Sequence, residues 1–315
     1  MLEKIHGEFD NRRAIIVRGL GPYSLKDTLE CGQVFRFEPK NNEKDYDEYI
    51  VTAYGRVIDV AQRERGELIF FEASDEDFEE VYRKYFALDT DLDMIKDDVI
   101  ARTDSEWLKL AAEFGKGIAI LAQEPYETLI SFIISQNNNI PRIKGIIKKI
   151  SAEYGVNITL QKAGEAKCPL SLCSGTPCEE NCKKCGVCYS FPKADEILGR
   201  PEGLLPAKPG FRYSYILDAA EKIYSGKVNL DMIAAARSYT HTVECLKEIK
   251  GVGDKVASCT ALFGFSNLEA FPIDVWMKRA IDTYFDGKLD PTTLGRYAGV
   301  AQQYIFHYIR NLEGV

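Results

Sequence analysis

The chain has 315 residues, of which 45% are hydrophobic and 28% charged, a composition that excludes disordered, collagen-like and coiled-coil proteins. No apolar run approaches the roughly 18 to 20 residues that a membrane-spanning helix requires. The formal net charge of −8 argues at first against a nucleic-acid partner. However, residues 1–100 hold 14 Lys and Arg against 24 Asp and Glu, so the excess acid lies there and a basic surface later in the chain is not excluded.

The amino terminus, Met1–Lys4, has no basic segment followed by an apolar core, and we find no lipidation or import motif. We therefore expect a cytoplasmic protein of prokaryotic type that does not associate with membranes. Because this compartment is reducing, we do not first interpret the nine cysteines as a disulfide framework.

The first 90 residues are predicted to form a domain with an antiparallel sheet and one helix. β-Branched and aromatic runs bounded by glycines predict strands over 14–17, 49–54, 57–60 and 68–71. Apolar residues from Phe78 to Phe86 recur at helical spacing behind a cap at Ser74 or Asp75.

Residues 91–315 are predicted to form a mostly helical domain, which makes the fold class α+β. Apolar residues recur there at steps of three and four. The expected helices cover 111–123, 127–136, 140–153, 213–224, 230–237, 243–249, 255–263, 275–284 and 293–312.

Residues 157–192 interrupt the helical pattern with a cysteine-rich insert. Its six cysteines are Cys168, Cys173, Cys178, Cys182, Cys185 and Cys188. Two CxxC steps suit a structural zinc site with four thiolate ligands. An iron–sulfur cluster or unligated thiols are the alternatives, and the spacing does not decide which four cysteines would bind. We expect the insert to be structural, and we expect no cofactor for catalysis.

Two predicted helices within 243–264 are joined by a tight turn, Gly251-Val252-Gly253. Glycines permit positive φ and leave backbone N–H groups uncovered beside a helix amino terminus. Such a corner binds a phosphate without recognising sequence. The alternative is an ordinary corner between two helices.

Lys255 follows this turn, and Asp274 follows Phe271-Pro272-Ile273 and precedes a predicted helix. A lysine in the first turn of a helix opposes the helix dipole, which should lower its pKa as an amine nucleophile requires. The alternatives are that Lys255 pairs with Asp254 or with phosphate and that Asp274 is only a helix N-cap. An amine and a carboxylate near one electrophilic carbon suit substitution at an anomeric centre.

Several motifs, in this order, give the chain a family resemblance that spans nearly all of it except the insert. They are ECGQVFR (30–36), SQNNNI (135–140), GFRY (210–213), the 246–257 hairpin, FPID (271–274) and YAGVAQ (297–302). With them the chain resembles the helix-hairpin-helix-GPD superfamily of base-excision glycosylases, and more narrowly 8-oxoguanine DNA glycosylase/lyase.

The resemblance implies roles for single residues around the damaged base. Lys255 would be the Schiff-base nucleophile, and Asp274 the carboxylate that assists cleavage of the glycosidic bond. The backbone carbonyl of Gly32 would accept the ring N–H that 8-oxoguanine has and guanine lacks, since guanine would leave that acceptor unpaired. The remaining implied base contacts are Gln302 at the pairing edge, with Cys259 and Phe306 on the two faces of the ring.

Further residues are implied to contact the duplex. Asn137 would fill the space of the flipped nucleotide, Arg142 and Arg212 would contact the cytosine left behind, and Phe211 would insert into the stack. Gly251 and Gly253 would bind a DNA phosphate.

The resemblance thus implies a bifunctional glycosylase/AP lyase that flips 8-oxoguanine paired with cytosine out of duplex DNA and acts as a monomer. The alternatives are a glycosylase for another damaged purine and a non-catalytic hairpin module that only binds DNA. Gly32, Gln302, Arg142 and Arg212 disfavour the first alternative. Lys255 and Asp274 together disfavour the second, because a module that only binds needs neither.

Overall fold

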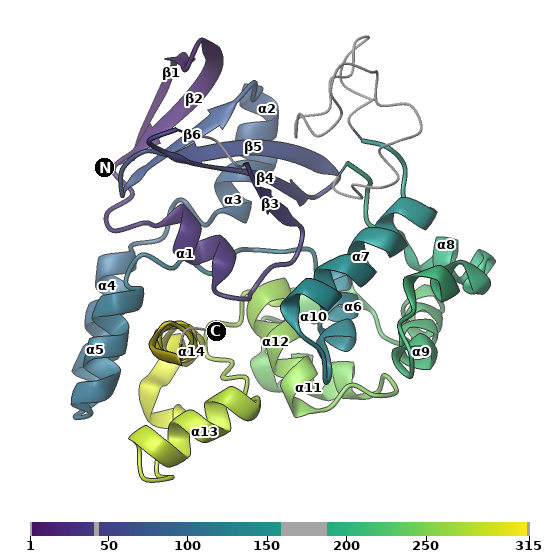
Figure 1. Ribbon diagram of the computed structural model, residues 1–315. Helices are drawn as coiled ribbons and strands as arrows, with labels where there is room; N and C mark the ends of the chain where they lie inside the picture. Colours follow the sequence, from purple (N-terminus) through teal and green to yellow (C-terminus); the bar gives the residue numbers. More distant parts are fainter. Residues whose placement is uncertain (1, 41–43, 159–187, 314–315) are drawn as a thin grey trace.

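The computed structural model describes residues 2–40, 44–158 and 188–313. A six-stranded sheet near the amino terminus lies beside a larger assembly of helices (Figure 1), which confirms the predicted α+β class. The strands are β1 (Glu3–Phe9), β2 (Arg12–Arg18), β3 (Phe37–Pro39), β4 (Asp47–Ala53), β5 (Arg56–Gln62) and β6 (Glu67–Phe71).

The sheet has the order β1-β2-β6-β5-β4-β3, and all its pairings are antiparallel. A helical segment that begins after the N-cap Ser74 covers one face, and it buries Phe78 and Phe86 against Phe70 of β6. The predicted strands and the predicted cap at Ser74 are confirmed. The segment comprises α2 (Asp75–Asp77), the π-helical turn η1 (Phe78–Tyr82) and α3 (Arg83–Tyr85).

The remaining helices include most of those predicted, and all but the first of them follow the sheet strands in the sequence. They are α1 (Leu25–Glu30), α4 (Leu92–Ala101), α5 (Glu106–Gly115), α6 (Pro125–Ser135), α7 (Ile140–Tyr154), α8 (Ala194–Gly199), α9 (Arg212–Tyr224), α10 (Leu230–Ala236), α11 (Tyr239–Lys247), α12 (Asp254–Phe265), α13 (Val275–Tyr284) and α14 (Ala298–Glu313), with the 3-10 helices η3 (Pro201–Ala207) and η4 (Pro291–Tyr297).

The predicted helix over 111–123 is wrong beyond Gly115, where α5 ends. Residues 117–122 carry no helix and run beside the start of the chain instead. The amide of Ala119 donates to the Thr28 hydroxyl, and the buried Gln33 side chain bonds the carbonyl of Ala119 and the amide of Leu121. These side chains replace the hydrogen bonds that a helix would supply.

The predicted helix over 293–312 is two helices. Gly295 has φ 64° and ψ −149°, so the backbone turns sharply between the start of η4 and α14. Such a backbone conformation is open to glycine and closed to residues with a Cβ.

Among the described residues, buried apolar side chains form a small group on β2, β5 and β6 and three larger groups. One lies under the sheet, one among α6, α7, α9 and α12, and one among α5, α13 and α14. Helix α12 packs on α6 and α11, and α14 packs on α5 and α13. No helix among the described residues is long and apolar enough to cross a membrane.

Candidate active site

A cavity of about 490 Å³ lies among α6, α7, α12, α13, α14 and the turn after α1, within the size range of small-molecule sites. Segments more than 200 residues apart in the sequence form its wall. Six residues predicted to contact or cleave the substrate line it together: Gly32, Lys255, Cys259, Asp274, Gln302 and Phe306. The cavity therefore joins the candidate nucleophile, the candidate carboxylate and the candidate base contacts in one space.

Lys255 lies in the first turn of α12, and its amine faces α6. Its Nζ donates to the Ser135 hydroxyl at 3.1 Å and lies 5.0 Å from the centre of the Phe132 ring. Asp254, the alternative partner, is instead paired with Lys247 at 2.6 Å on the surface. The Lys255 amine is thus held in the cavity by an uncharged acceptor rather than neutralised by a neighbouring carboxylate.

Cys259 lies one turn after Lys255 on the same helix and is buried. Burial raises the pKa of its thiol to about 11, an effect that the nearby Lys255 amine partly opposes. The thiol is therefore protonated at neutral pH, and a protonated thiol is a poor nucleophile. Lys255 therefore remains the candidate nucleophile in this wall of the cavity.

Asp274 is the N-cap of α13, as its position after a proline predicts. Its Oδ1 accepts a hydrogen bond from the Met277 amide at 2.8 Å. A carboxylate has two oxygens, so the cap leaves one for the cavity that Asp274 also lines. The cap fixes the side chain. Asp274 can therefore be both the N-cap of α13 and a carboxylate that faces the cavity.

Gly32 follows α1 in a conformation that requires glycine. Its φ is +91°, and a Cβ there would lie 3.3 Å from the Phe306 ring. Any side chain would thus be strained and would press on a residue of the cavity wall. Glycine brings the backbone at this position close to the space that a base would occupy.

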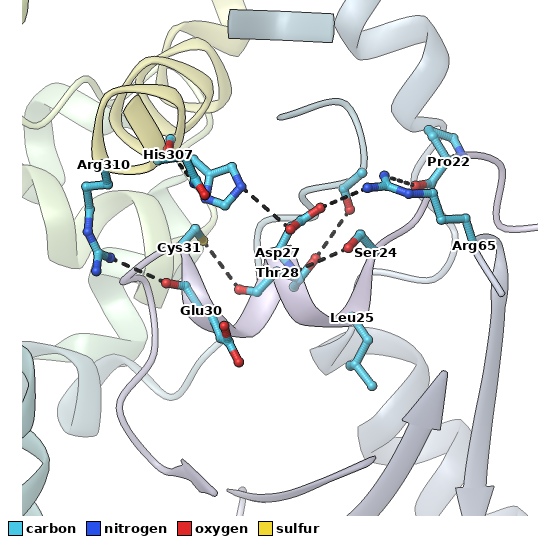
Figure 2. Close-up of polar contacts among 12 residues, drawn as sticks. Pro22, Ser24, Leu25, Asp27, Thr28, Glu30, Cys31, Arg65, His307 and Arg310 are labelled. Carbon is cyan, nitrogen blue, oxygen red and sulfur yellow. Dashed lines mark hydrogen bonds and ion pairs between the residues drawn. The ribbon is translucent and has the colours of Figure 1, made fainter. Parts of the chain in front are cut away.

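Two contacts between α1 and α14 hold Gly32 near Phe306 (Figure 2). The His307 ring nitrogen lies 3.6 Å from Asp27, and Arg310 donates to the Glu30 carbonyl at 3.4 Å. Burial alone would raise the pKa of Asp27, but hydrogen bonds from His307 and Ser24 outweigh it and hold that pKa below its ordinary value. Helix α1, which leads into Gly32, is therefore joined at two positions to α14, which carries Gln302 and Phe306.

The residues predicted to contact the rest of the duplex lie outside the cavity. Asn137 and Arg142 are exposed at the turn before α7 and in its first helical turn, and Phe211 is 53% exposed before α9. Arg212 is only 3% exposed, and its guanidinium donates to the carbonyls of Gln136, Asn137 and Pro209. In this structure Arg212 supports the turn that carries Asn137, and its contact with a cytosine stays a prediction.

The two hairpin glycines have different reasons to be glycine. Gly251 has φ +80°, and a Cβ there would lie 2.3 Å from the Tyr215 ring. Gly253 has φ −99° and open space around it, so it does not use the positive φ that a glycine permits. Gly253 is the N-cap of α12, where it leaves the positive end of the helix dipole uncovered.

Of the six predicted metal ligands, only Cys188 falls within the described residues, where it is buried. Cys168, Cys173, Cys178, Cys182 and Cys185 lie outside them. Among the described residues, no group of three or more His, Cys, Asp or Glu side chains could hold a metal ion. The metal site therefore stays a prediction.

Four residues that the sequence did not single out individually also take part in the site. Ser135 holds the amine of Lys255, Gln303 bonds the amide of Gln302 at 2.7 Å, and His307 and Arg310 join α14 to α1. Ser135 opens a motif that carried the family resemblance, which was the one sequence signal for it. The other three follow residues that the motifs do identify.

Comparisons with known proteins agree with this geometry. The family model for the N-terminal domain of 8-oxoguanine DNA glycosylase matches residues 16–129. The N-glycosylase/DNA lyase of Saccharomyces cerevisiae is 30% identical over 275 residues, which are 81% of this chain and 66% of the yeast protein.

Two solved structures match nearly the whole chain. MBOgg1 in complex with a low-affinity DNA ligand has a TM-score of 0.81 and 33% identity, with 99% of each chain covered. The Clostridium acetobutylicum 8-oxoguanine glycosylase/lyase, bound to duplex DNA with cytosine opposite 8-oxoguanine, has a TM-score of 0.79 and 31% identity, with 99% of this chain and 98% of that chain covered. The chain therefore belongs to the 8-oxoguanine DNA glycosylase/lyase family.

Proposed function

We propose that the protein is a bifunctional DNA glycosylase and AP lyase that excises 8-oxoguanine paired with cytosine from duplex DNA. The observation that carries this proposal is the single cavity lined by Lys255, Asp274 and Gly32. A nucleotide flipped out of the duplex places its base and its anomeric carbon in one enclosed site. The relatives named above agree with this activity.

In the proposed reaction, the uncharged Lys255 amine attacks C1′ as the bond from C1′ to the base nitrogen breaks. The electron pair of that bond leaves with the base, and positive charge develops on the sugar. Asp274, fixed by its cap at the rim of the same cavity, stabilises this charge. Ring opening gives an imine between Lys255 and C1′. Loss of a proton from C2′ then expels the 3′ phosphate by β-elimination.

Selection of the damaged base is proposed to depend on Gly32. Its backbone carbonyl would accept the N7–H of 8-oxoguanine, and an undamaged guanine has a lone pair at that position. Two acceptors facing each other in a dry site are unfavourable. Phe306, whose ring lies beside Gly32, and the neutral thiol of Cys259 would hold the two faces of the base.

The exposed residues around the cavity are proposed to hold the duplex. The Gly251–Gly253 hairpin would bind phosphate at the amino terminus of α12. Asn137 would occupy the vacated space, Phe211 would insert into the stack, and Arg142 and Arg212 would contact the unpaired cytosine. The exposure of Asn137, Arg142 and Phe211 on neighbouring elements supports this arrangement.

We further propose that the cysteine-rich insert binds a structural zinc ion, with an iron–sulfur cluster as the alternative, in a reducing cytoplasmic compartment. The described ends of the insert lie side by side. The Ile158 amide donates to the Cys188 carbonyl, and the Ser190 amide donates to the Val156 carbonyl, both at 2.9 Å. The insert therefore leaves and returns to the domain at one place, which supports a role separate from the chemistry.

The proposed function is tested with a panel of duplexes that carry 8-oxoguanine or an alkylated purine opposite each of the four bases. We expect strand cleavage without added alkali for 8-oxoguanine, and fastest opposite cytosine. Excision of the alkylated purine alone would establish the rival glycosylase activity. Binding of all the duplexes without excision of any base would establish a non-catalytic module.

A further inference from the structure

Arg310 is a cation in the cavity wall that the proposed reaction does not use. Among the described residues that line the cavity, Lys255 and Arg310 are the two with a positively charged side chain. The Nη1 of Arg310 lies 3.8 Å from the position that a Cβ on Gly32 would take, and its guanidinium carbon lies 5.7 Å from the centre of the Phe306 ring. The guanidinium therefore lies at the corner where Gly32 and Phe306 meet.

The guanidinium of Arg310 has donors and charge to spare. Figure 2 shows its bond to the Glu30 carbonyl, which it makes from Nη1 at 3.4 Å, and a guanidinium carries five N–H donors. The two acidic side chains of α1 have other partners, since Asp27 pairs with His307 and the carboxylate of Glu30 accepts from Tyr49. The charge of Arg310 is therefore not neutralised by α1 and can act on a group inside the cavity.

Gln302, Phe306 and Arg310 follow one another at steps of four residues on α14, and all three line the cavity. Residues four apart lie on one face of a helix, and each such step advances about 6 Å along its axis. In the proposed complex, Gln302 contacts the pairing edge of the base and Phe306 stacks on its ring. The next position on this face then meets the opposite end of the purine, which carries N7 and C8.

We propose that Arg310 binds the C8 oxygen of the flipped 8-oxoguanine and stabilises the negative charge that the base gains as it leaves. This inference rests on the proposed function, because the bond of N7–H to Gly32 places C8 and its oxygen beside Arg310. Guanine carries only hydrogen at C8, so this contact adds to the selection at N7.

The charge arises when the bond between C1′ and N9 breaks. Its electron pair passes to N9 and is shared through C8 with the oxygen, while the Lys255 amine bonds C1′. A cation that already lies at this oxygen stabilises the transition state without having to reorganise. The attacking amine then loses a proton and the base gains one, so the released base is neutral.

The test compares Arg310→Met with the wild type on 8-oxoguanine and on 8-thioguanine, each opposite cytosine. Methionine is unbranched like arginine but has neither charge nor donor. 8-Thioguanine keeps N7–H and carries at C8 a sulfur, which is a weak acceptor. We expect single-turnover excision of 8-oxoguanine to slow about ten- to hundredfold, the factor that a hydrogen bond to a charged group supports. The ratio of the 8-oxoguanine rate to the 8-thioguanine rate should fall at least about threefold.

Two controls accompany this comparison. Arg310→Lys keeps the charge and should recover part of the lost rate. Cleavage of a preformed abasic site, which has no base, should stay unchanged, and DNA affinity should stay within a few-fold.

An equal loss on both bases would mean that Arg310 only joins α14 to α1. A loss of abasic-site cleavage or of DNA affinity would mean that it contacts a phosphate. Either result overturns the inference while the proposed function stands. If the wild type excises neither base, the proposed function itself fails, and the inference fails with it.

Discussion

The Nζ of Lys255 lies 3.1 Å from the hydroxyl oxygen of Ser135, and that hydroxyl donates its own proton to the Phe132 carbonyl at 2.8 Å. Because the hydroxyl proton is already used, the Ser135 oxygen can only accept from the amine. The contact therefore holds Lys255 against α6 in the wall of the cavity, and the partner is an uncharged hydroxyl.

Ser135→Ala is expected to slow formation of the covalent DNA complex about three- to tenfold, because one hydrogen bond that positions the amine is lost. Ser135→Thr keeps the hydroxyl and serves as the matched control. Single-turnover trapping rates and DNA affinity are the measurements. Equal rates for the alanine variant and the wild type would show that this contact does not position the amine.

Asp274→Asn separates the two roles of Asp274. Asparagine is as good an N-cap as aspartate, so α13 and the melting temperature should be preserved. The excision rate should fall about a hundredfold or more, because the charge is needed where positive charge develops, while DNA affinity stays within a few-fold.

Excision rate, DNA affinity and thermal melting of this variant decide between the roles. Loss of binding together with a lower melting temperature would mean that Asp274 acts mainly as a cap. The comparison is informative because asparagine preserves the bond to the Met277 amide.

Much of this fold could be predicted from local sequence patterns, and the exceptions have physical causes. The periodicity before Gly115 continues into 117–122, but that segment is not helical, because Thr28 and Gln33 satisfy part of its backbone. Strand β1 carries no strong apolar alternation and is fixed by pairing with β2.

In the candidate site, too, local sequence patterns mark some residues and miss others. Lys255 and Asp274 are marked by their local surroundings, a glycine turn and a proline before a helix. Gly32 and Gln302 came only from the family resemblance. The bond of Ser135 to Lys255 and the pairing of Asp27 with His307 join residues 120 and 280 positions apart, and no local pattern encodes such contacts.

Glu124 is expected to make stability fall as the pH rises. Burial, with a further contribution from the charge of Glu127, raises the pKa of Glu124 to about 7. The folded protein therefore binds a proton more tightly than the unfolded chain, and stability is lost between about pH 4.5 and 7. Glu124→Gln keeps an oxygen that can accept from the Tyr54 amide. This variant should be more stable than the wild type at pH 8, by at most about 3 kcal/mol.

Urea unfolding at several pH values measures how the stability of the wild type and of Glu124→Gln depends on pH. At pH 4.5 the wild-type carboxyl is largely protonated, so the variant and the wild type should nearly coincide, which is the internal control. A variant that is less stable than the wild type at pH 8 would show that the Glu124 charge is favourable in the folded state.

The cysteine-rich insert is expected to contribute to stability or DNA affinity but not to catalysis. Because its described ends are hydrogen-bonded to each other, a short glycine-rich linker should replace residues 159–187 without moving them. The deletion variant should still excise 8-oxoguanine and should be less stable or bind DNA more weakly.

Elemental analysis of protein purified without metal affinity should find close to one zinc, or iron with visible absorption if the insert holds a cluster. Metal-free wild-type protein of full stability would refute the metal site. A deletion variant that folds normally but loses all excision would refute the purely structural role.

Borohydride trapping on a duplex that contains 8-oxoguanine opposite cytosine is the most direct test of Lys255 as the nucleophile. Only a primary amine forms the reducible imine with the sugar. We expect a covalent protein–DNA complex with the wild type and none with Lys255→Gln, whereas DNA affinity stays comparable. A trapped complex of undiminished yield in Lys255→Gln would contradict the assignment of Lys255 as the nucleophile.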